Sequence, residues 1–358
     1  MGTGEPAAGN PRLVARIRDE ILAAAGERVT FAHYMQLALT EPGLGYYATS
    51  ETRPTREGDF LTAPELHPFF GRCLGRLVAS AAAEAASSPF RVLEYGSGRG
   101  TLRDHVLEGL ELEVEWTRAD LPHRSDRREG PADLVLANEF LDALPVHRVR
   151  QDGELCELYV GWQNGRFTEV AAEPSTPELR AYLVAGGIEL RAGQRAEICL
   201  EAPRWVASAA RELTPGGVLL IIDYGHEAAE LYGPRRLAGS LLTYRGHRVD
   251  DDPYSAVGHI DITAHVDLSA LERAASAAGL RSVGSATQGR FLARLGLGDL
   301  LAELGSRTDV APDEYLAARA AVARLLDPRH LGGFAVRAWA RPDRTGRVPK
   351  LPGFHDTP

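Results

Sequence analysis

Three glycines alternate with other residues in the run Glu94-Tyr95-Gly96-Ser97-Gly98-Arg99-Gly100-Thr101, and this spacing can form a cofactor site. Glycine has no Cβ and tolerates positive φ, so the backbone can approach a ligand closely. A turn of this form between a strand and a helix also presents the positive end of the helix. The run therefore indicates a ligand-binding turn, and its spacing bears on which ligand.

The spacing of this turn favours one class of cofactor. A dinucleotide-binding turn reads G-x-G-x-x-G, whereas the sixth position here is Thr101 and Glu94 stands two places before the first glycine. The form E-x-G-x-G-x-G favours S-adenosylmethionine, whose amino-acid end and ribose would pack against the turn. We predict that Glu94, Gly96, Gly98 and Gly100 bind this cofactor. A plain strand-to-helix turn is the alternative.

Acidic residues that follow the turn are candidates for binding the rest of the cofactor. A carboxylate about twenty residues after the first glycine is expected to accept hydrogen bonds from the ribose hydroxyls. Glu115 stands at this distance, and Glu113 is an alternative. Asp120 is a candidate for contacting the adenine amino group. Exposed acids on an edge strand are the other interpretation.

The segment Asn138-Glu139-Phe140-Leu141-Asp142-Ala143-Leu144-Pro145 follows an expected strand, and open α/β sheets bind ligands beyond the carboxyl ends of their strands. Methyl transfer is an in-line displacement that requires alignment of donor and acceptor and removal of a proton. Glu139 and Asp142 are the predicted catalytic carboxylates, because they could hold an arginine guanidinium and polarise its attacking nitrogen. Helix capping by Asn138 and Asp142 is the alternative.

Two further residues at strand ends complete the predicted site. Asn138 is assigned to the cofactor. Asp223, in Asp223-Tyr224-Gly225, occupies the place equivalent to Glu139 on a later strand and is a third catalytic candidate, although a capped turn accounts for it equally well.

The elements that must position these residues follow from hydrophobic periodicity. Short apolar runs predict parallel strands covered on both faces; they are Val92-Leu93, Leu112 to Trp116, Asp133 to Ala137 and Val218 to Ile222. Alternating runs separated by Asp152-Gly153 and Asn164-Gly165 predict an antiparallel meander; they are Val146 to Val149, Glu154 to Trp162 and Arg166 to Val170.

Helical spacing predicts the remaining elements. Helices are expected over Leu13 to Leu22, Phe31 to Leu39, Leu102 to Leu110, Leu271 to Ala278, Phe291 to Leu304 and Tyr315 to Leu326. The residues beyond Gly45 are expected to form a loop.

Composition excludes several classes of protein. A net charge of -9 argues against binding to nucleic acid, which needs a concentrated basic surface. The longest apolar run is far shorter than the ~20 residues of a membrane-spanning helix. Three scattered cysteines, and a start that lacks the pattern of a secretory signal, predict a cytoplasmic protein. His259, Asp261, His265 and Asp267 lack recognised ligand spacing, so hydrogen bonding is favoured over a metal site.

Taken together, the motifs resemble the MidA-like methyltransferases, which include a mitochondrial respiratory complex I assembly factor that methylates arginine. Besides the glycine turn and Asn138 to Pro145, the resemblance rests on Tyr34-Met35, Pro42 to Tyr47, Gly58 to Glu65, Ile222 to Gly225, Asp261 to Asp267 and Thr287 to Leu292. It implies a Rossmann-like core, S-adenosylmethionine and an arginine acceptor. It also implies that Gly58 to Glu65 cover the cofactor, through Asp59, Thr62 and Pro64.

The chain departs from the family between the glycine turn and Asn138. Family members carry there a strand that ends in Val-Glu-x-Ser, and no Glu-x-Ser occurs in residues 102–132. Trp116-Thr117-Arg118 instead resembles the family's following strand. If the ribose-binding strand is trimmed away, Glu115 is not the ribose acid.

The expected architecture is a Rossmann-like doubly wound α/β sheet with an N-terminal helical and loop region, an antiparallel β-meander insertion and added C-terminal helices. The expected ranges are the N-terminal region (1–90), the core (91–145 and 213–340), the insertion (146–212) and a tail (341–358). The predicted activity is methyl transfer from S-adenosylmethionine to a nitrogen or oxygen of a protein arginine or a small molecule. A non-catalytic assembly protein that keeps the fold is the alternative, and a homodimer is left open.

Overall fold

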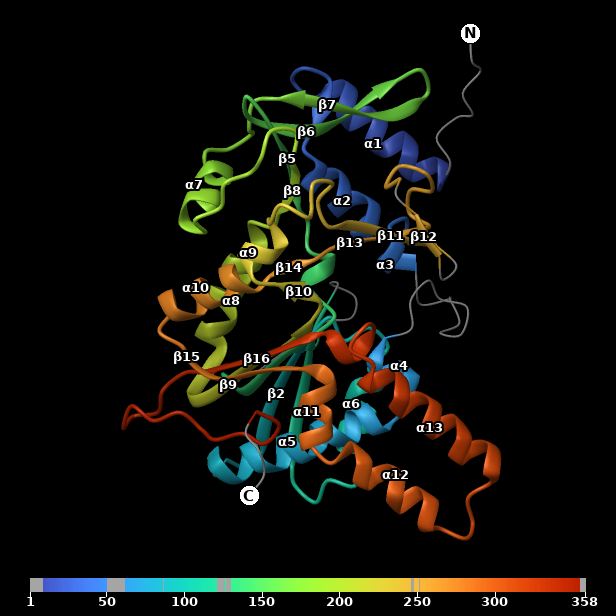
Figure 1. The fold of residues 1–358 in the computed structure, drawn as a ribbon, viewed down its shortest axis with the longest axis vertical. Helices are drawn as coiled ribbons and strands as arrows, with labels where there is room; N and C mark the ends of the chain where they lie inside the picture. The colour runs from blue at the N-terminus through green and yellow to red at the C-terminus, as the bar shows by residue number, and fades with distance from the viewer. Residues whose placement is uncertain are drawn as a thin grey trace. The chain divides into compact units, whose positions relative to one another are not determined.

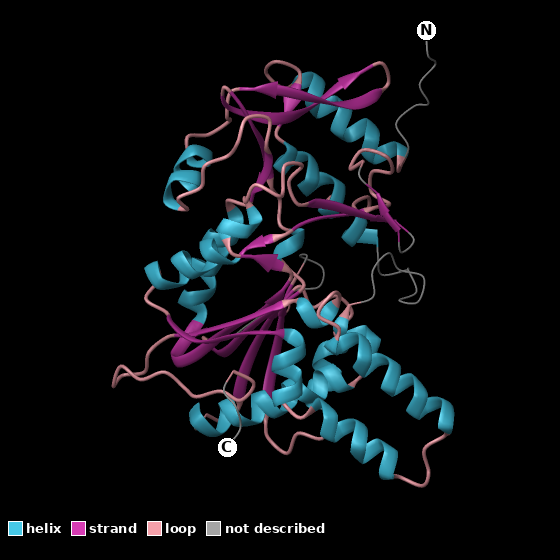
Figure 2. Cartoon of the chain, in the orientation of Figure 1, coloured by secondary structure: helices cyan, strands magenta, loops and turns pink. Residues whose placement is uncertain are grey.

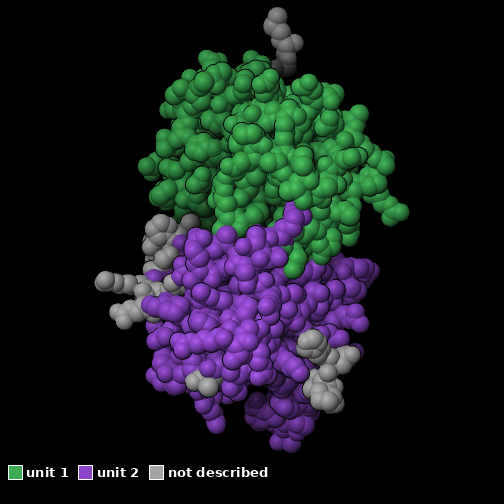
Figure 3. Space-filling model, turned by 90° about the vertical axis from the view of Figure 1, so that its left-hand side faces the viewer, with its two compact units in different colours: residues 1–60, 142–204, 225–272 green, residues 61–141, 205–224, 273–358 purple. Residues whose placement is uncertain are grey.

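The computed structural model describes residues 9–49, 62–85, 87–120, 126, 130–245, 248–250 and 252–354 (Figure 1). Both helices and strands are present, cyan and magenta in Figure 2. The chain divides into two compact units, green and purple in Figure 3. Unit 1 comprises residues 1–60, 142–204 and 225–272, and unit 2 comprises residues 61–141, 205–224 and 273–358. By this division, residues 225–272 belong to the same unit as the meander.

A six-stranded sheet forms the centre of unit 2, in the order β15-β16-β9-β4-β2-β3. Its strands are β2 (Phe90–Tyr95), β3 (Val114–Ala119), β4 (Ala132–Asn138), β9 (Leu213–Asp223), β15 (Arg281–Thr287) and β16 (Ala335–Ala340). Strands β3, β2, β4 and β9 are parallel neighbours, whereas β16 pairs antiparallel with both β9 and β15. Every residue of β4 is buried, as expected for a parallel strand covered on both faces. The mixed α/β fold is thus as predicted, with two strands, β15 and β16, that periodicity missed.

The order of the strands explains where a ligand would bind. From β2 the chain crosses to β3 on one side and returns to β4 on the other. Loops that leave the carboxyl ends of such strands diverge, and the crevice between them is where open α/β sheets bind ligands. The glycine turn lies at the carboxyl end of β2, at this point of divergence.

The helices of unit 2 correct two expectations. They are α4 (Ala63–Leu66), α5 (Phe69–Ala85), α6 (Thr101–Leu107), α11 (Gln288–Arg294), α12 (Leu297–Ser306) and α13 (Pro312–Leu326). The loop expected beyond Gly45 is wrong over α5, whose buried Phe70, Leu74 and Leu77 follow helical spacing. The helix expected over Phe291 to Leu304 is two helices, because Gly296 adopts φ +82° between them.

Unit 1 contains the antiparallel meander. It is built from β5 (His147–Asp152), β6 (Glu154–Gln163) and β7 (Arg166–Ala172), and β8 (Arg195–Ile198) pairs with β5 while β1 (Arg28–Val29) pairs with β6. Asn164 and Gly165 both have positive φ, as the two-residue turn between β6 and β7 requires. The hairpins are therefore as predicted.

Helices and short strands complete unit 1. Helices α1 (Pro11–Ala23) and α2 (Phe31–Thr40) are capped by the side chains of Asn10 and Thr30, and their apolar faces share a core with Val160 and Phe167. Strands β11 (Leu241–Arg245), β12 (Arg248–Asp250) and β13 (Asp261–Ala264) form a small antiparallel sheet, and β10 (Gly225–His226) pairs with β14 (Val266–Asp267). The remaining helices are α3 (Tyr46–Thr49), α7 (Glu178–Ala185) and α9 (Ala228–Leu231); α8 (Glu201–Glu212) and α10 (Leu268–Ala277) contain residues of both units.

No helix within the described ranges combines the length and the apolar character needed to cross a bilayer.

Candidate functional site

The glycine turn has the geometry of a ligand cradle. Gly96, Gly98 and Gly100 all have positive φ, at +69°, +51° and +80°. A Cβ on Gly96 would lie 3.0 Å from the Phe140 ring, whereas a Cβ on Gly98 or Gly100 would meet no described atom within 4 Å. Gly96 is therefore required for packing inside the protein. Gly98 and Gly100 leave open space that a side chain would fill.

Asp120 braces this turn from the end of β3. Its Oδ2 accepts hydrogen bonds from Gly98 N (2.9 Å) and Ser97 Oγ (3.4 Å). A carboxylate that bonds the turn fixes the orientation of Gly98 and adds negative charge beside the cradle. Asp120 was assigned to the adenine amino group, and the structure places it against the glycine turn itself.

Glu115 lies away from the turn. In the parallel register Glu115 is opposite Arg91, and its carboxylate accepts a hydrogen bond from Arg91 Nε at 3.1 Å. The residue opposite Glu94, next to the turn, is Arg118. Strand β3 pairs directly with β2, so no described strand separates them, and the acid at the carboxyl end of β3 is Asp120. The structure places Asp120 beside the glycine turn, whereas Glu115 lies away from it.

Glu94 is a buried carboxylate at the end of β2, only 3% exposed. Its Oε2 accepts a hydrogen bond from Trp116 Nε1 at 2.9 Å. Burial raises the pKa of Glu94 to about 7; the negative charge of Asp120 also raises it, and the Trp116 bond acts in the opposite direction. This acid can therefore change its protonation state near neutral pH.

Asn138 and Glu139 form the carboxyl end of β4. Glu139 has φ +49°, a left-handed conformation that a non-glycine residue rarely adopts and that costs of order 1 kcal/mol. Its Oε1 accepts hydrogen bonds from Ala63 N (3.0 Å) and Asn138 Nδ2 (3.3 Å). The Oδ1 atom of Asn138 is buried and has no hydrogen-bond partner among the described residues. The strain and the unpartnered oxygen both make this strand end a candidate functional site.

Asp223 holds the turn that follows Glu139. Its side chain is fully buried. Asp223 Oδ2 accepts hydrogen bonds from Phe140 N (3.2 Å) and Leu141 N (2.8 Å), and Asp223 Oδ1 accepts one from Tyr224 N (2.9 Å). Asp223 was predicted to be catalytic. These three bonds fix the backbone beyond Glu139, and the catalytic role of Asp223 stays a prediction.

The segment predicted to cover the cofactor is described in part. Asp59 lies outside the described residues. Thr62 precedes α4 and Pro64 is buried in its first turn. Between them, the amide of Ala63 donates to Glu139. Thr62 and Pro64 are therefore brought to the end of β4.

An aromatic group that the sequence analysis missed stands at the same sheet edge. The rings of Tyr95 and Phe140 lie 5.6 Å apart, and Trp205 on α8 contacts both, at 5.1 and 5.4 Å between centroids. Tyr95 and Phe140 lie within the glycine-turn run and the Asn138 to Pro145 segment. No local sequence pattern predicts that Trp205 lies beside these two rings, because only the folded chain brings α8 to them.

In unit 1, Asp142 belongs to a group of acids and phenols. Asp142 and Asp261 are buried, at 6% and 8% exposed. Tyr47 Oη donates to Asp261 Oδ1 at 2.8 Å, and Tyr244 lies opposite Asp261 in the β11–β13 register. Burial raises the pKa of Tyr47 well above its ordinary value, and the negative charges of Asp261 and Asp142 raise it further. This group therefore concentrates negative charge around partly exposed aromatic rings.

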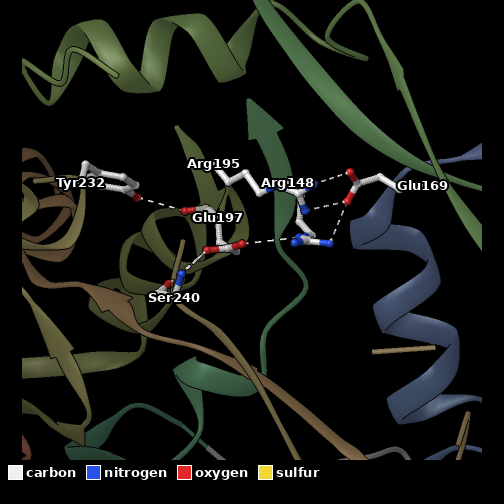
Figure 4. Close-up of polar contacts among 6 residues, drawn as sticks. All are labelled: Arg148, Glu169, Arg195, Glu197, Tyr232 and Ser240. Carbon is white, nitrogen blue, oxygen red and sulfur yellow. Dashed lines mark hydrogen bonds and ion pairs between the residues drawn. The ribbon is translucent and has the colours of Figure 1, made fainter. Parts of the chain in front are cut away.

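A buried ionic network in unit 1 supports β11, the strand that carries Tyr244. Figure 4 shows Arg148 between two acids, with Glu169 Oε2 3.3 Å from its Nη1 and Glu197 Oε1 3.4 Å from its Nε. Glu197 Oε2 also accepts a hydrogen bond from Ser240 N at 2.5 Å. Ser240 directly precedes β11. The network fixes the start of that strand.

The histidines and aspartates of the metal alternative have protein partners. Tyr47 donates to Asp261, and Tyr182 donates to Asp267. The ring of His265 stacks on that of His226, and burial, with the nearby charges of Arg236 and His226, lowers the pKa of His265 to about 4. Within the described part of the chain, no three His, Cys, Asp or Glu side chains are placed to hold a metal.

A protein-family model matches the middle of the chain. It is described as "Putative S-adenosyl-L-methionine-dependent methyltransferase" and matches residues 108–286, half of the chain. A solved structure of a COG1565 superfamily member from Burkholderia thailandensis, bound to S-adenosyl-homocysteine, is 31% identical. The match covers 96% of this chain and 94% of that chain, with a TM-score of 0.83.

Curated relatives include mitochondrial protein arginine methyltransferases. The NDUFAF7 homolog of Drosophila melanogaster is 29% identical, with 90% of this chain and 83% of that protein covered. NDUFAF7 of Danio rerio is 26% identical, with 84% and 80% covered. These mitochondrial relatives contradict the predicted cytoplasmic location, which is therefore wrong. Scattered thiols could not support it, because they suit any reducing compartment.

Proposed function

The chain belongs to the MidA-like family of S-adenosyl-L-methionine-dependent methyltransferases, and from this premise we propose that it methylates an arginine side chain of a protein. Relatives that match over most of the chain are named protein arginine methyltransferases. The proposed arginine acceptor of this chain is inferred from these relatives. The residues at the sheet edge support that choice on chemical grounds.

We propose that the cofactor rests on the glycine turn of unit 2. The observation that carries this proposal is the open space at Gly98 and Gly100, where positive φ and the absence of a Cβ leave room for a ligand against the backbone. Asp120 places a carboxylate on this turn, and a negative charge there suits a cofactor that carries a sulfonium and an ammonium. Glu94 stands two residues before Gly96, at the end of β2. Thr62 and Pro64 are proposed to line the other side of the cofactor.

The strand order supports a finer description of the fold. Four parallel neighbours, with a point of divergence at the strand that carries the glycine turn, are typical of a class I, Rossmann-like methyltransferase sheet. We infer that β3 serves as the cofactor-side edge of this sheet. Asp120 then takes the place that Glu115 was expected to have.

The chemistry divides between the cofactor and the protein. The bound cofactor supplies a methyl group on positively charged sulfur. The protein must hold the acceptor nitrogen in line with that methyl group and take up the proton that the nitrogen loses. Glu139 is the proposed residue for the proton, because its carboxylate stands at the carboxyl end of β4 on a strained, fixed backbone.

An assay of where the methyl group goes tests the proposed acceptor. The purified protein would be incubated with radiolabelled S-adenosyl-L-methionine and an extract of cells that lack its gene. Acid-precipitable label should be recovered as methylarginine after hydrolysis, and a Glu139→Gln variant should transfer much less. Label found only in the solvent-extractable fraction would identify a small-molecule acceptor and overturn the arginine proposal.

A further inference from the structure

In the buried side-chain amide of Asn138, the nitrogen has a hydrogen-bond partner and the oxygen has none among the described residues. Its Nδ2 donates to Glu139 Oε1 at 3.3 Å, and that same oxygen accepts the Ala63 amide. Its Oδ1 is buried without a partner among the described residues, and the residue is only 8% exposed. A buried carbonyl left unpaired costs about 1 to 3 kcal/mol, so such an atom needs an explanation.

The orientation of the Asn138 amide is fixed by its neighbour. Rotation of the amide by a half turn would place Oδ1 against the carboxylate of Glu139, which repels another acceptor. Nδ2 must therefore face Glu139, and Oδ1 must face away from it. The partner that Oδ1 lacks has to be a hydrogen-bond donor.

The position of Asn138 favours the methyl acceptor over the cofactor as that donor. Asp120 braces the glycine turn from β3, on one side of β2, whereas Asn138 ends β4 on the other side. If the cofactor rests on the glycine turn beside Asp120, the side chain of Asn138 at the end of β4 is available to bind the acceptor. A guanidinium suits this place, because it carries only donors and Asn138 stands beside a carboxylate.

We propose that Asn138 Oδ1 accepts a hydrogen bond from the guanidinium nitrogen that receives the methyl group, an inference that rests on the proposed function. The bond orients the nitrogen so that its electron pair forms the new C–N bond. The S–C bond breaks with its electron pair left on sulfur, and the displaced N–H proton passes to the carboxylate of Glu139. Asn138 is thereby a residue that recognises the acceptor, in place of the cofactor contact expected from the sequence.

Binding measurements on two variants test this assignment without turnover. Wild type, Asn138→Leu and Asn138→Asp would be titrated with S-adenosylhomocysteine by calorimetry, and each saturated protein would then be titrated with N-acetyl-arginine amide. Asn138→Leu removes the acceptor atom and should weaken arginine amide binding about tenfold or more. Asn138→Asp keeps an oxygen there, but its second oxygen replaces the donor to Glu139, so it should bind arginine amide more tightly than Asn138→Leu and no more tightly than wild type. All three should bind S-adenosylhomocysteine alike.

The outcomes separate this proposal from the function on which it rests. Wild type that fails to bind S-adenosylhomocysteine overturns the proposed function and this proposal together. Equal binding of arginine amide by wild type and Asn138→Leu, or no binding of it by saturated wild type, overturns the role of Asn138 alone. If Asn138→Leu loses as much affinity for S-adenosylhomocysteine as for arginine amide, Oδ1 binds the cofactor and this proposal is overturned. Asn138→Leu should unfold at most slightly below wild type, because it loses the 3.3 Å bond from Nδ2 while Glu139 Oε1 keeps the amide of Ala63.

Discussion

The buried carboxyl of Glu94 should make the protein less stable as the pH rises toward neutrality. Its pKa is raised to about 7 in the folded protein, from an ordinary value of 4.5. Between these two values the folded state binds more protons than the unfolded state, so the free energy of unfolding falls with increasing pH. The stabilisation associated with the neutral carboxyl is fully present below pH 4.5 and is lost as the pH passes 7.

The size of the effect follows from the displacement of the pKa. A difference of roughly 2.5 units at about 1.36 kcal/mol per unit gives about 3 kcal/mol in total. Roughly 2 to 3 kcal/mol of this should be lost between pH 5 and pH 8. Because Glu94 is almost completely buried, solvent screening reduces this figure little.

A Glu94→Gln variant isolates this contribution. Gln cannot ionise, fits the same space and keeps an oxygen for the Trp116 bond. Urea unfolding of both proteins from pH 5 to pH 8 should show Glu94→Gln gaining stability relative to wild type as the pH rises. Glu115→Gln, on the neighbouring strand, is the matched control for the substitution itself. A constant difference between wild type and Glu94→Gln across this range would refute the reasoning.

Two further predictions concern buried acids that fix local structure in each unit. Glu197→Ala should lower the free energy of unfolding by about 3 kcal/mol in urea, because Arg148 loses one of two acids in a buried network; an unchanged unfolding midpoint would contradict this. Asp223→Ala should cost about 3 kcal/mol, since three backbone N–H groups lose their acceptor. Calorimetry would measure this loss, and a melting temperature equal to that of wild type would show that Asp223 does not organise the turn after Glu139.

Local patterns in the sequence predicted the local part of the site. The glycine turn, the strand that ends at Asn138 and the Asn164-Gly165 hairpin each depend on residues close together in the chain. Such features leave a sequence signal, because turn geometry and strand burial restrict residue types directly. Helix α5 left a clear helical pattern as well, and that pattern was overlooked.

Contacts between distant residues could not be predicted in this way. The hydrogen bond between Tyr47 and Asp261 joins residues 214 positions apart, and no local pattern specifies it. The role of Asp120 depended on which strand lies beside β2. Sequence spacing favoured Glu115, whereas the parallel register places Glu115 beside Arg91 and Asp120 beside the turn.

The most direct test of the account is the affinity of S-adenosylhomocysteine for two glycine variants. Gly98→Asn and Gly109→Asn place the same side chain at positive φ, +51° and +79°, and each meets open space in the protein. Asparagine tolerates this conformation, so both variants should fold. We expect Gly109→Asn to bind as wild type does and Gly98→Asn to bind S-adenosylhomocysteine at least about tenfold more weakly in calorimetry. Unchanged affinity in Gly98→Asn would contradict the claim that the cofactor rests on this turn.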